Sequence, residues 1–205
     1  MNHSTIPPVW FRLPPGFYDI GLGDRDPLDR IAEFLGSTDA RRDIAQLMDR
    51  LDELAVHQVV HTSVGLHPDD LVGISTSLFS LTVRRVEHPN PRATVAQTAL
   101  DIAQSALWIS SECRLIDLPS SLPCCLVAGC IAPPGEEQHL FQARVVTAHP
   151  NDQHVLILDL TSAATQHSES YISVLEAITH TVSFSDPTPS PSNTTGTSRI
   201  LEVLL

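Results

Sequence analysis

The chain has 205 residues, of which 42% are hydrophobic and 18% are charged, a composition that suits one domain of ordinary size with a sizeable apolar core. Wholesale disorder is excluded, because that much apolar burial offsets the entropy lost when the chain is ordered. Acidic residues outnumber basic ones by 24 to 12, and the net charge of -12 argues against binding to nucleic acid or to an anionic lipid surface.

The basic residues, the amino terminus and the cysteines indicate the source and the compartment. All 12 basic residues are Arg, and this absence of Lys is typical of a GC-rich genome and favours an actinobacterial source. The amino terminus lacks the charged and apolar regions of a secretory signal, and no run approaches the about 20 apolar residues of a membrane helix. We therefore expect a cytoplasmic protein without membrane insertion. Its cysteines are expected to be small buried hydrophobic residues: Cys113, Cys124, Cys125 and Cys130.

The first part of the chain predicts an arm followed by two helices. Residues 1–27 hold an aromatic segment around a Pro-Pro-Gly turn, which predicts an extended arm that anchors on the core. A short helix is expected over 28–35, with a proline before its first residue and a glycine after its last. A longer helix is expected over 39–55, because apolar residues recur there at steps of three and four.

From residue 56 the apolar pattern becomes alternating or continuous, which predicts strands separated by Pro-rich turns. The expected strands are 56–66, 71–87, 113–118, 124–131, 140–148 and 154–160, and helical spacing recurs over 94–109 and 168–183. We therefore expect a single α+β domain over 28–184, with a central antiparallel sheet packed by helices. Residues 185–205 predict a disordered linker with an apolar carboxyl-terminal end.

This order of elements resembles the PsbP/Mog1-like fold, which actinobacterial proteins of the LpqN type share. The likeness is carried by 10–17, 78–107, 141–160 and the closing Thr179-His180-Thr181-Val182-Ser183-Phe184, and it covers most of 10–184. The stretch 39–67 also looks like a run common in uncharacterised Streptomyces proteins. The resemblance implies a non-enzymatic binding or assembly factor, because most proteins of this fold act in that way.

A metal centre is the sharpest alternative to that view, because imidazole and carboxylate groups occur together at His61, His67 and Asp69. On an extended strand the two histidines lie on one face but about 20 Å apart, too far to share an ion unless the chain bends at Gly65. The cysteines lack C-x-x-C spacing, which favours core packing over zinc binding. We predict no metal and no cofactor, and we keep a metal-dependent or small-ligand enzyme around these three residues as an alternative.

Catalytic motifs are missing from the sequence. There is no G-x-S-x-G elbow or comparable nucleophile signature. Residues 21–24 hold two glycines of a phosphate loop but lack its third glycine and its lysine. The adjacent carboxylates at 69–70 and 136–137 fall in expected loops, where solvation makes general-acid work improbable. The sequence therefore predicts no catalytic residue and a protein that is not an enzyme.

Aromatic and apolar side chains near the two ends are the candidate partner-binding residues, because such side chains carry much of the energy at interfaces. The arm presents them to a partner, or instead covers the sheet with them. The carboxyl-terminal end is apolar enough to add a strand to an open sheet edge or to dock on a partner. The candidates are Trp10, Phe11, Phe17, Tyr18, Ile200, Leu201, Val203 and Leu204.

The sequence as a whole predicts a protein that binds a protein partner or itself. The first interpretation is a non-enzymatic protein-binding or accessory factor, for example of an actinobacterial secretion or assembly system. The enzyme built around His61, His67 and Asp69 is one alternative. A structural subunit that self-associates through an exposed sheet edge is the other.

Overall fold

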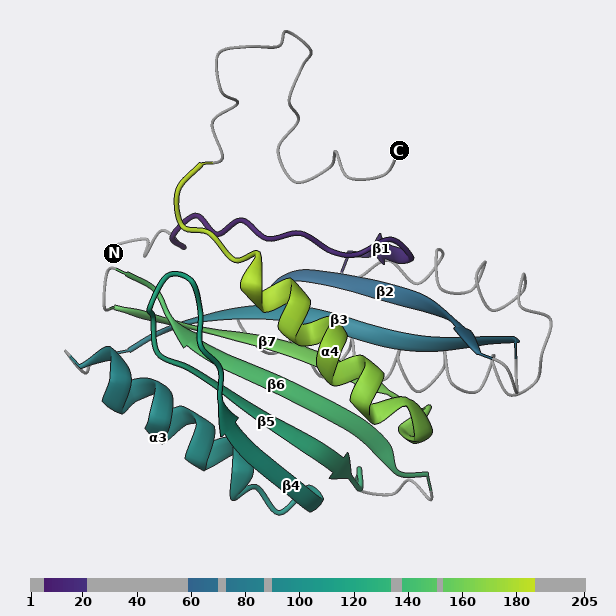
Figure 1. The fold of residues 1–205 in the computed structure, drawn as a ribbon. Coiled ribbons are helices and arrows are strands. Elements are labelled where there is room, and N and C mark those ends of the chain that lie inside the picture. Colours follow the sequence, from purple (N-terminus) through teal and green to yellow (C-terminus); the bar gives the residue numbers. More distant parts are fainter. Residues whose placement is uncertain are drawn as a thin grey trace, which may run out of the picture.

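The computed structural model describes residues 6–21, 59–69, 73–86, 90–133, 138–150 and 153–186. In this part of the chain, seven strands form one sheet in which every neighbouring pair is antiparallel (Figure 1). The strands are β1 (Phe17–Asp19), β2 (Val59–Asp69), β3 (Gly73–Arg85), β4 (Trp108–Leu115), β5 (Cys124–Ile131), β6 (Leu140–Ala148) and β7 (His154–Ser162). Their order across the sheet is β1-β2-β3-β7-β6-β5-β4, so β1 and β4 form its two edges. The predicted α+β class with a central antiparallel sheet is confirmed.

Within the described ranges, two helices cover opposite faces of this sheet: α3 (Pro91–Ala103) and α4 (Ser168–His180), the latter preceded by the 3-10 turn η1 (Thr165–His167). On β6, the side chains of Phe141 and Ala143 join the apolar cluster beneath α4, whereas Val146 joins the cluster beneath α3. Successive side chains of a strand point to opposite faces, so the two clusters are separate cores. Figure 1 shows α4 crossing the sheet and α3 beside its β4–β5 end. Neither helix is long and apolar enough to cross a membrane.

The core beneath α4 explains why that helix forms where the sequence predicts it. Its buried residues Tyr171, Ile172, Leu175 and Ile178 recur at steps of one, three and three and so make one apolar stripe. Tyr171 stacks on Phe141 of β6 with ring centroids 5.9 Å apart. Each large apolar side chain buried here contributes about 1.5–3 kcal/mol, which fixes α4 on the sheet.

The helix expected over 94–109 is shorter and starts earlier in the structure. Its first turn is capped by Asn90, whose side-chain oxygen accepts hydrogen bonds from the backbone N–H groups of Arg92 and Ala93 at 3.1 and 3.2 Å. Pro91 is accepted at the first helical position because its missing N–H would have no partner there.

The carboxyl-terminal boundary of α3 corrects the predicted strand as well. The chain leaves the helix after Ala103, and β4 spans Trp108–Leu115 rather than 113–118. Trp108 begins this strand, packs half-buried against the cluster beneath α3, and donates its indole N–H to the carbonyl of Ile102 at 2.7 Å. Pairing with β5 overrides the helix-like spacing of 104–109.

The other boundaries agree with the sequence to varying degrees. β5 and β6 span the expected residues, while β7 continues two residues further and α4 stops three residues earlier than expected. The turn expected at 67–70 is largely strand, because β2 stays paired with β3 as far as Asp69 opposite Gly73. The helices expected over 28–35 and 39–55 lie outside the described residues, as do residues 187–205.

The amino-terminal arm is tied to the segment that follows α4. Trp10 and Ser183 form an isolated antiparallel bridge, with hydrogen bonds of 2.9 and 2.8 Å between their backbones. The N–H of Arg12 also donates to the hydroxyl of Thr181 at 2.8 Å. The arm then enters the sheet as β1, so it belongs to the same packed unit as the strands.

Gly129 of β5 provides a test of the β4–β5 pairing. A Cβ atom at this position would lie 1.9 Å from the carbonyl oxygen of Ser110, which is backbone and cannot rotate away. We expect Gly129→Ala to destabilise the protein by about 1–3 kcal/mol, because β4 must move to make room. Ser110→Ala is the control, since it keeps the carbonyl. Denaturant unfolding measures both, and equal stability of the two variants would contradict the pairing.

Candidate functional site

The aromatic residues predicted to bind a partner have different positions in the arm. Phe17 is 4% exposed and belongs to the core beneath α4, and the ring of Phe11 packs 5.6 Å from that of Phe79. Trp10 is half-buried at its bridge, whereas Tyr18 is 46% exposed. The two Phe side chains therefore cover the sheet, and Tyr18 faces solvent at the β1 edge. The carboxyl-terminal candidates Ile200, Leu201, Val203 and Leu204 lie outside the described residues.

A group of polar side chains lies beneath the start of α4, where β2 and β3 approach it. The Nε2 atom of His67 is 2.7 Å from the hydroxyl of Ser77, and the hydroxyl of Ser75 is 3.0 Å from that of Tyr171. Gly65 makes the first contact possible, because a Cβ there would lie 2.6 Å from both the imidazole and the serine oxygen. A glycine on a buried strand therefore has a packing role that the sequence alone did not reveal.

The three residues considered as metal ligands do not meet. His61 lies 3.4 Å from the carboxylate of Asp19, while Asp69 is paired with His167 at 2.6 Å. Across the described ranges, no three His, Cys, Asp or Glu side chains gather closely enough to hold a metal ion. The strand β2 is continuous through both histidines, and each imidazole faces its own neighbour.

Burial controls the protonation of these histidines. It lowers the pKa of His67 below the ordinary 6.5, and a positive charge on the nearby His167 would lower it further. Burial likewise lowers the pKa of His61, partly opposed by the carboxylate of Asp19, and that of His154. The neutral form of each imidazole is therefore favoured in the folded protein.

This shift makes stability depend on pH in a defined direction. The unfolded chain binds a proton at His67 near pH 6.5, whereas the folded protein binds it only at lower pH. The stability that His67 contributes is thus complete above about pH 6.5 and is lost as the pH falls below that value. We expect the free energy of unfolding of His67→Gln to fall less steeply than that of the wild type as the pH is lowered from about 7 to 5. Denaturant titrations across this range measure the slope, and identical slopes would contradict the assignment.

The cysteines lie in β4 and β5, and two of them are in contact. The sulfur atoms of Cys113 and Cys125 are 3.2 Å apart, and both thiols are free. Burial raises the pKa of Cys125 to about 12, assisted by the contact with Cys113, and burial also raises that of Cys124 to about 12. These two thiols are therefore poor nucleophiles. Cys113 is exposed on β4 and Cys130 is half-buried on β5, so the expectation that all four cysteines are buried is wrong for these two.

A polar cluster that the sequence analysis missed lies between β6 and β7. Gln142 donates to the carboxylate of Asp159 at 3.1 Å and to the hydroxyl of Thr161 at 3.1 Å, and Arg144 forms an ion pair with Asp159. Two polar residues at alternate positions of an otherwise apolar strand were the available signal. The members bond to one another across two strands, so the cluster fixes their register.

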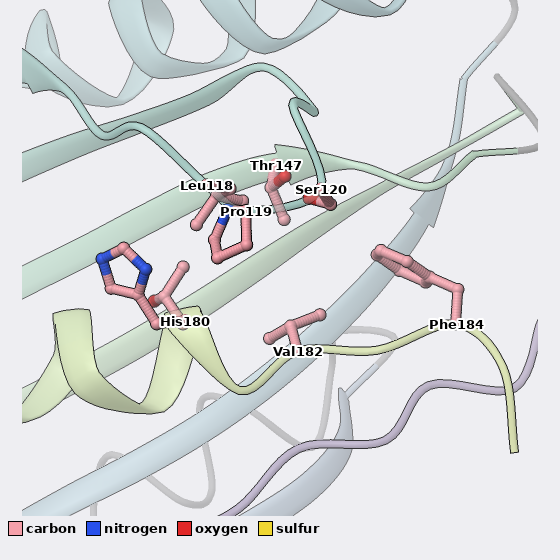
Figure 2. Close-up of a pocket in the computed structure, with 8 residues that line it drawn as sticks. Leu118, Pro119, Ser120, Thr147, His180, Val182 and Phe184 are labelled. Atoms are coloured by element: carbon pink, nitrogen blue, oxygen red, sulfur yellow. The ribbon is translucent and has the colours of Figure 1, made fainter. Parts of the chain in front are cut away.

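A small pocket lies between the β4–β5 connection and the end of α4 (Figure 2). It is lined by Leu118, Pro119, Ser120, Thr147, Thr179, His180, Val182 and Phe184, and its volume is about 40 Å³. That space holds a water-sized group and is too small for an organic substrate. Phe184 also packs edge-on against His149, with ring centroids 4.6 Å apart, which anchors the segment after α4.

The open edge of the sheet at β4 is the most exposed regular element in the described part of the chain. Every residue of this strand after Trp108 is exposed, and Leu115 is 81% exposed. Among the described residues, seven large hydrophobic side chains are exposed, and four of them belong to α3, β4 or the chain between them: Leu100, Leu107, Ile109 and Leu115. A strand that is paired on one side only, with exposed apolar residues around it, can pair with another strand on its open side.

The hydrogen bonds of β4 show which of its backbone groups are open. The N–H of Ile116 donates to the carbonyl of Cys124 at 3.1 Å, so residue 116 faces β5. Backbone groups alternate in direction along an antiparallel strand. It follows that the N–H and C=O groups of Ser111, Cys113 and Leu115 point away from the sheet.

The described residues therefore form an α+β fold, in which a seven-stranded antiparallel sheet has a helix on each face and ends in a long exposed edge strand. The structure is similar to the crystal structure of LpqN, a protein involved in cell envelope biogenesis of Mycobacterium tuberculosis. The two have a TM-score of 0.50 and 12% sequence identity, over 88% of this chain and 86% of LpqN. The LpqN-like fold predicted from the sequence is thus confirmed. No protein-family model matches the chain, and no curated protein matches its sequence.

Proposed function

We propose that the chain is a non-enzymatic protein-binding or accessory factor that receives an extended segment of a protein partner at β4. The observation that carries this proposal is the exposure of β4 along its length. By comparison, the opposite edge strand, β1, has only three residues. An eight-residue strand offers a partner a longer row of backbone groups, which is the basis of strand addition.

Backbone and side chains would contribute different parts of such binding. The outward N–H and C=O groups at Ser111, Cys113 and Leu115 supply hydrogen bonds that any extended segment can make. The exposed side chains of Ile109 and Leu115 supply apolar area, which favours partners with apolar residues at alternate positions. The strand contains no proline or lysine, the residues that often protect a sheet edge from pairing.

Three polar contacts in the interior have a structural explanation and so fit the binding proposal. His67 bonds to Ser77, Tyr171 to Ser75 and Asp69 to His167, on elements that must stay in register. Such contacts have a sufficient explanation in stability, because an unpaired buried polar group costs about 1–3 kcal/mol. An enzyme centred on His61, His67 and Asp69 has no comparable support from their positions.

The fold gives the proposal a biological setting. LpqN is involved in cell envelope biogenesis, and we place this chain in the same broad role, as an accessory factor of an assembly or secretion system. We further propose that the chain is one of the PsbP/Mog1-like actinobacterial proteins and is related to Streptomyces sequences. Its proposed location is the cytoplasm.

A proline substitution tests the role of β4. Ser111→Pro removes one outward N–H while leaving the hydrogen bonds to β5, because residue 111 faces away from that strand. We expect recovery of the partner to fall at least about fivefold, as loss of one hydrogen bond of about 1 kcal/mol predicts. The measurement is quantitative mass spectrometry of proteins cross-linked to the tagged chain in its native cells.

Ser111→Ala is the matched control, because it changes the same side chain and keeps the N–H. Its partner recovery is expected to equal that of the wild type. Thermal unfolding of all three proteins shows whether the proline variant keeps its fold. Equal recovery by the folded proline variant and the control would count against binding at β4.

A further inference from the structure

We infer that β4 binds β4 of a second copy of this chain, antiparallel and in a register centred on Cys113. This inference rests on the proposed function, because it names the partner that occupies the same edge. The carrying observation is that the segment 111–115 is complementary to itself in backbone direction, in charge and in exposed side chains.

The backbone satisfies the first requirement. A register centred on Cys113 places Ser111 opposite Leu115 of the second copy and Cys113 opposite its own equivalent. These are the residues whose N–H and C=O groups point away from β5, so each facing pair can exchange both of its hydrogen bonds. In a register shifted by one residue, backbone groups that point away from β5 would instead lie opposite groups that point toward it.

Charge satisfies the second requirement in the same register. Glu112 of one copy falls opposite Arg114 of the other, and the two-fold axis repeats this pair. Both residues lie at positions where facing side chains approach most closely, and opposite charges placed directly across two strands attract. Arg114 already bonds to Glu176 of α4 at 2.8 Å, which holds the guanidinium on the α4 side of the sheet, the side to which Glu112 also points.

Apolar residues complete the surface. Cys113 contacts Cys125, so it lies on the α3 side of the sheet together with Leu115 and Ser111. In the paired strands, the exposed Leu115 side chain of each copy would lie on this side of the sheet, directly across from Ser111 of the other copy. The long-range repulsion between two chains of net charge -12 is screened over about 8 Å at physiological salt.

Charge reversal tests the register in the purified full chain. We expect sedimentation of the wild type to show a dimer, and Glu112→Arg or Arg114→Glu to weaken it roughly tenfold, because each variant places like charges opposite one another twice. The double variant Glu112→Arg/Arg114→Glu restores the attraction and should dimerise like the wild type. An equimolar mixture of the two single variants should form a heterodimer for the same reason.

Glu176→Gln is the control for the contact within one copy. It removes the partner of Arg114 on α4 and leaves both edge charges, so its dimer should match that of the wild type. A dimer weakened by the single reversals but restored neither in the double variant nor in the mixture would overturn the register. Folding of every variant is checked by its thermal unfolding.

Cross-linking at Cys113, an exposed residue of β4, provides an independent readout. Facing residues of this type have Cα atoms about 5.5 Å apart, so a short bismaleimide should join Cys113 to Cys113 of the second copy. The dimer band is expected in the wild type and the double variant and absent in Cys113→Ala. A wild type that stays monomeric at high concentration would overturn the inference, and continued β4-dependent capture of another protein would leave the proposed function intact. Loss of both would remove the proposed function as well.

Discussion

The antiparallel hydrogen-bond ladder is the constraint on which this structure depends. It joins β2, β3, β7, β6 and β5 into a sheet whose interior strands have partners on both sides, and each face is covered by a helix. Such a ladder must end somewhere, and in this chain its two ends differ. The first ends in three residues of β1 that belong to a well-packed arm, whereas the other ends in the eight exposed residues of β4.

Packing inside the sheet explains why function is better sought at its edge. The glycines on β2 and β5 allow close approaches that a methyl group would prevent, and polar side chains beneath α4 and between β6 and β7 bond to one another. These contacts fix the register of the strands, because a slip of one residue would move every side chain of a strand to the other face of the sheet. Register in turn determines which backbone groups of β4 face outward. Interior packing and edge recognition are therefore linked through the same alternation.

Apolar patterning predicted the α+β class, the limits of β5 and β6 and the stripe of α4, because each element buries residues at its own period. It failed between 104 and 109, where a helical spacing continues into a strand that pairs with β5. It also treated 67–70 as a turn, although pairing with β3 holds His67 to Asp69 in β2. Side-chain pairs such as His67 with Ser77 join separate strands, so the spacing of residues in the sequence does not predict them. The open state of β4 depends on strand order, which local patterns do not specify.

Amide hydrogen exchange along β4 tests the central claim most directly, because it reads the backbone groups themselves. Measured residue by residue in dilute and concentrated protein, the amides of Glu112 and Arg114 should be protected in both, since they face β5. The amides of Ser111, Cys113 and Leu115 should exchange readily in dilute protein and become protected in concentrated protein as a second strand pairs with them. Equal and rapid exchange of these three amides at both concentrations, with no protection on adding cell extract, would contradict the claim that this edge binds protein.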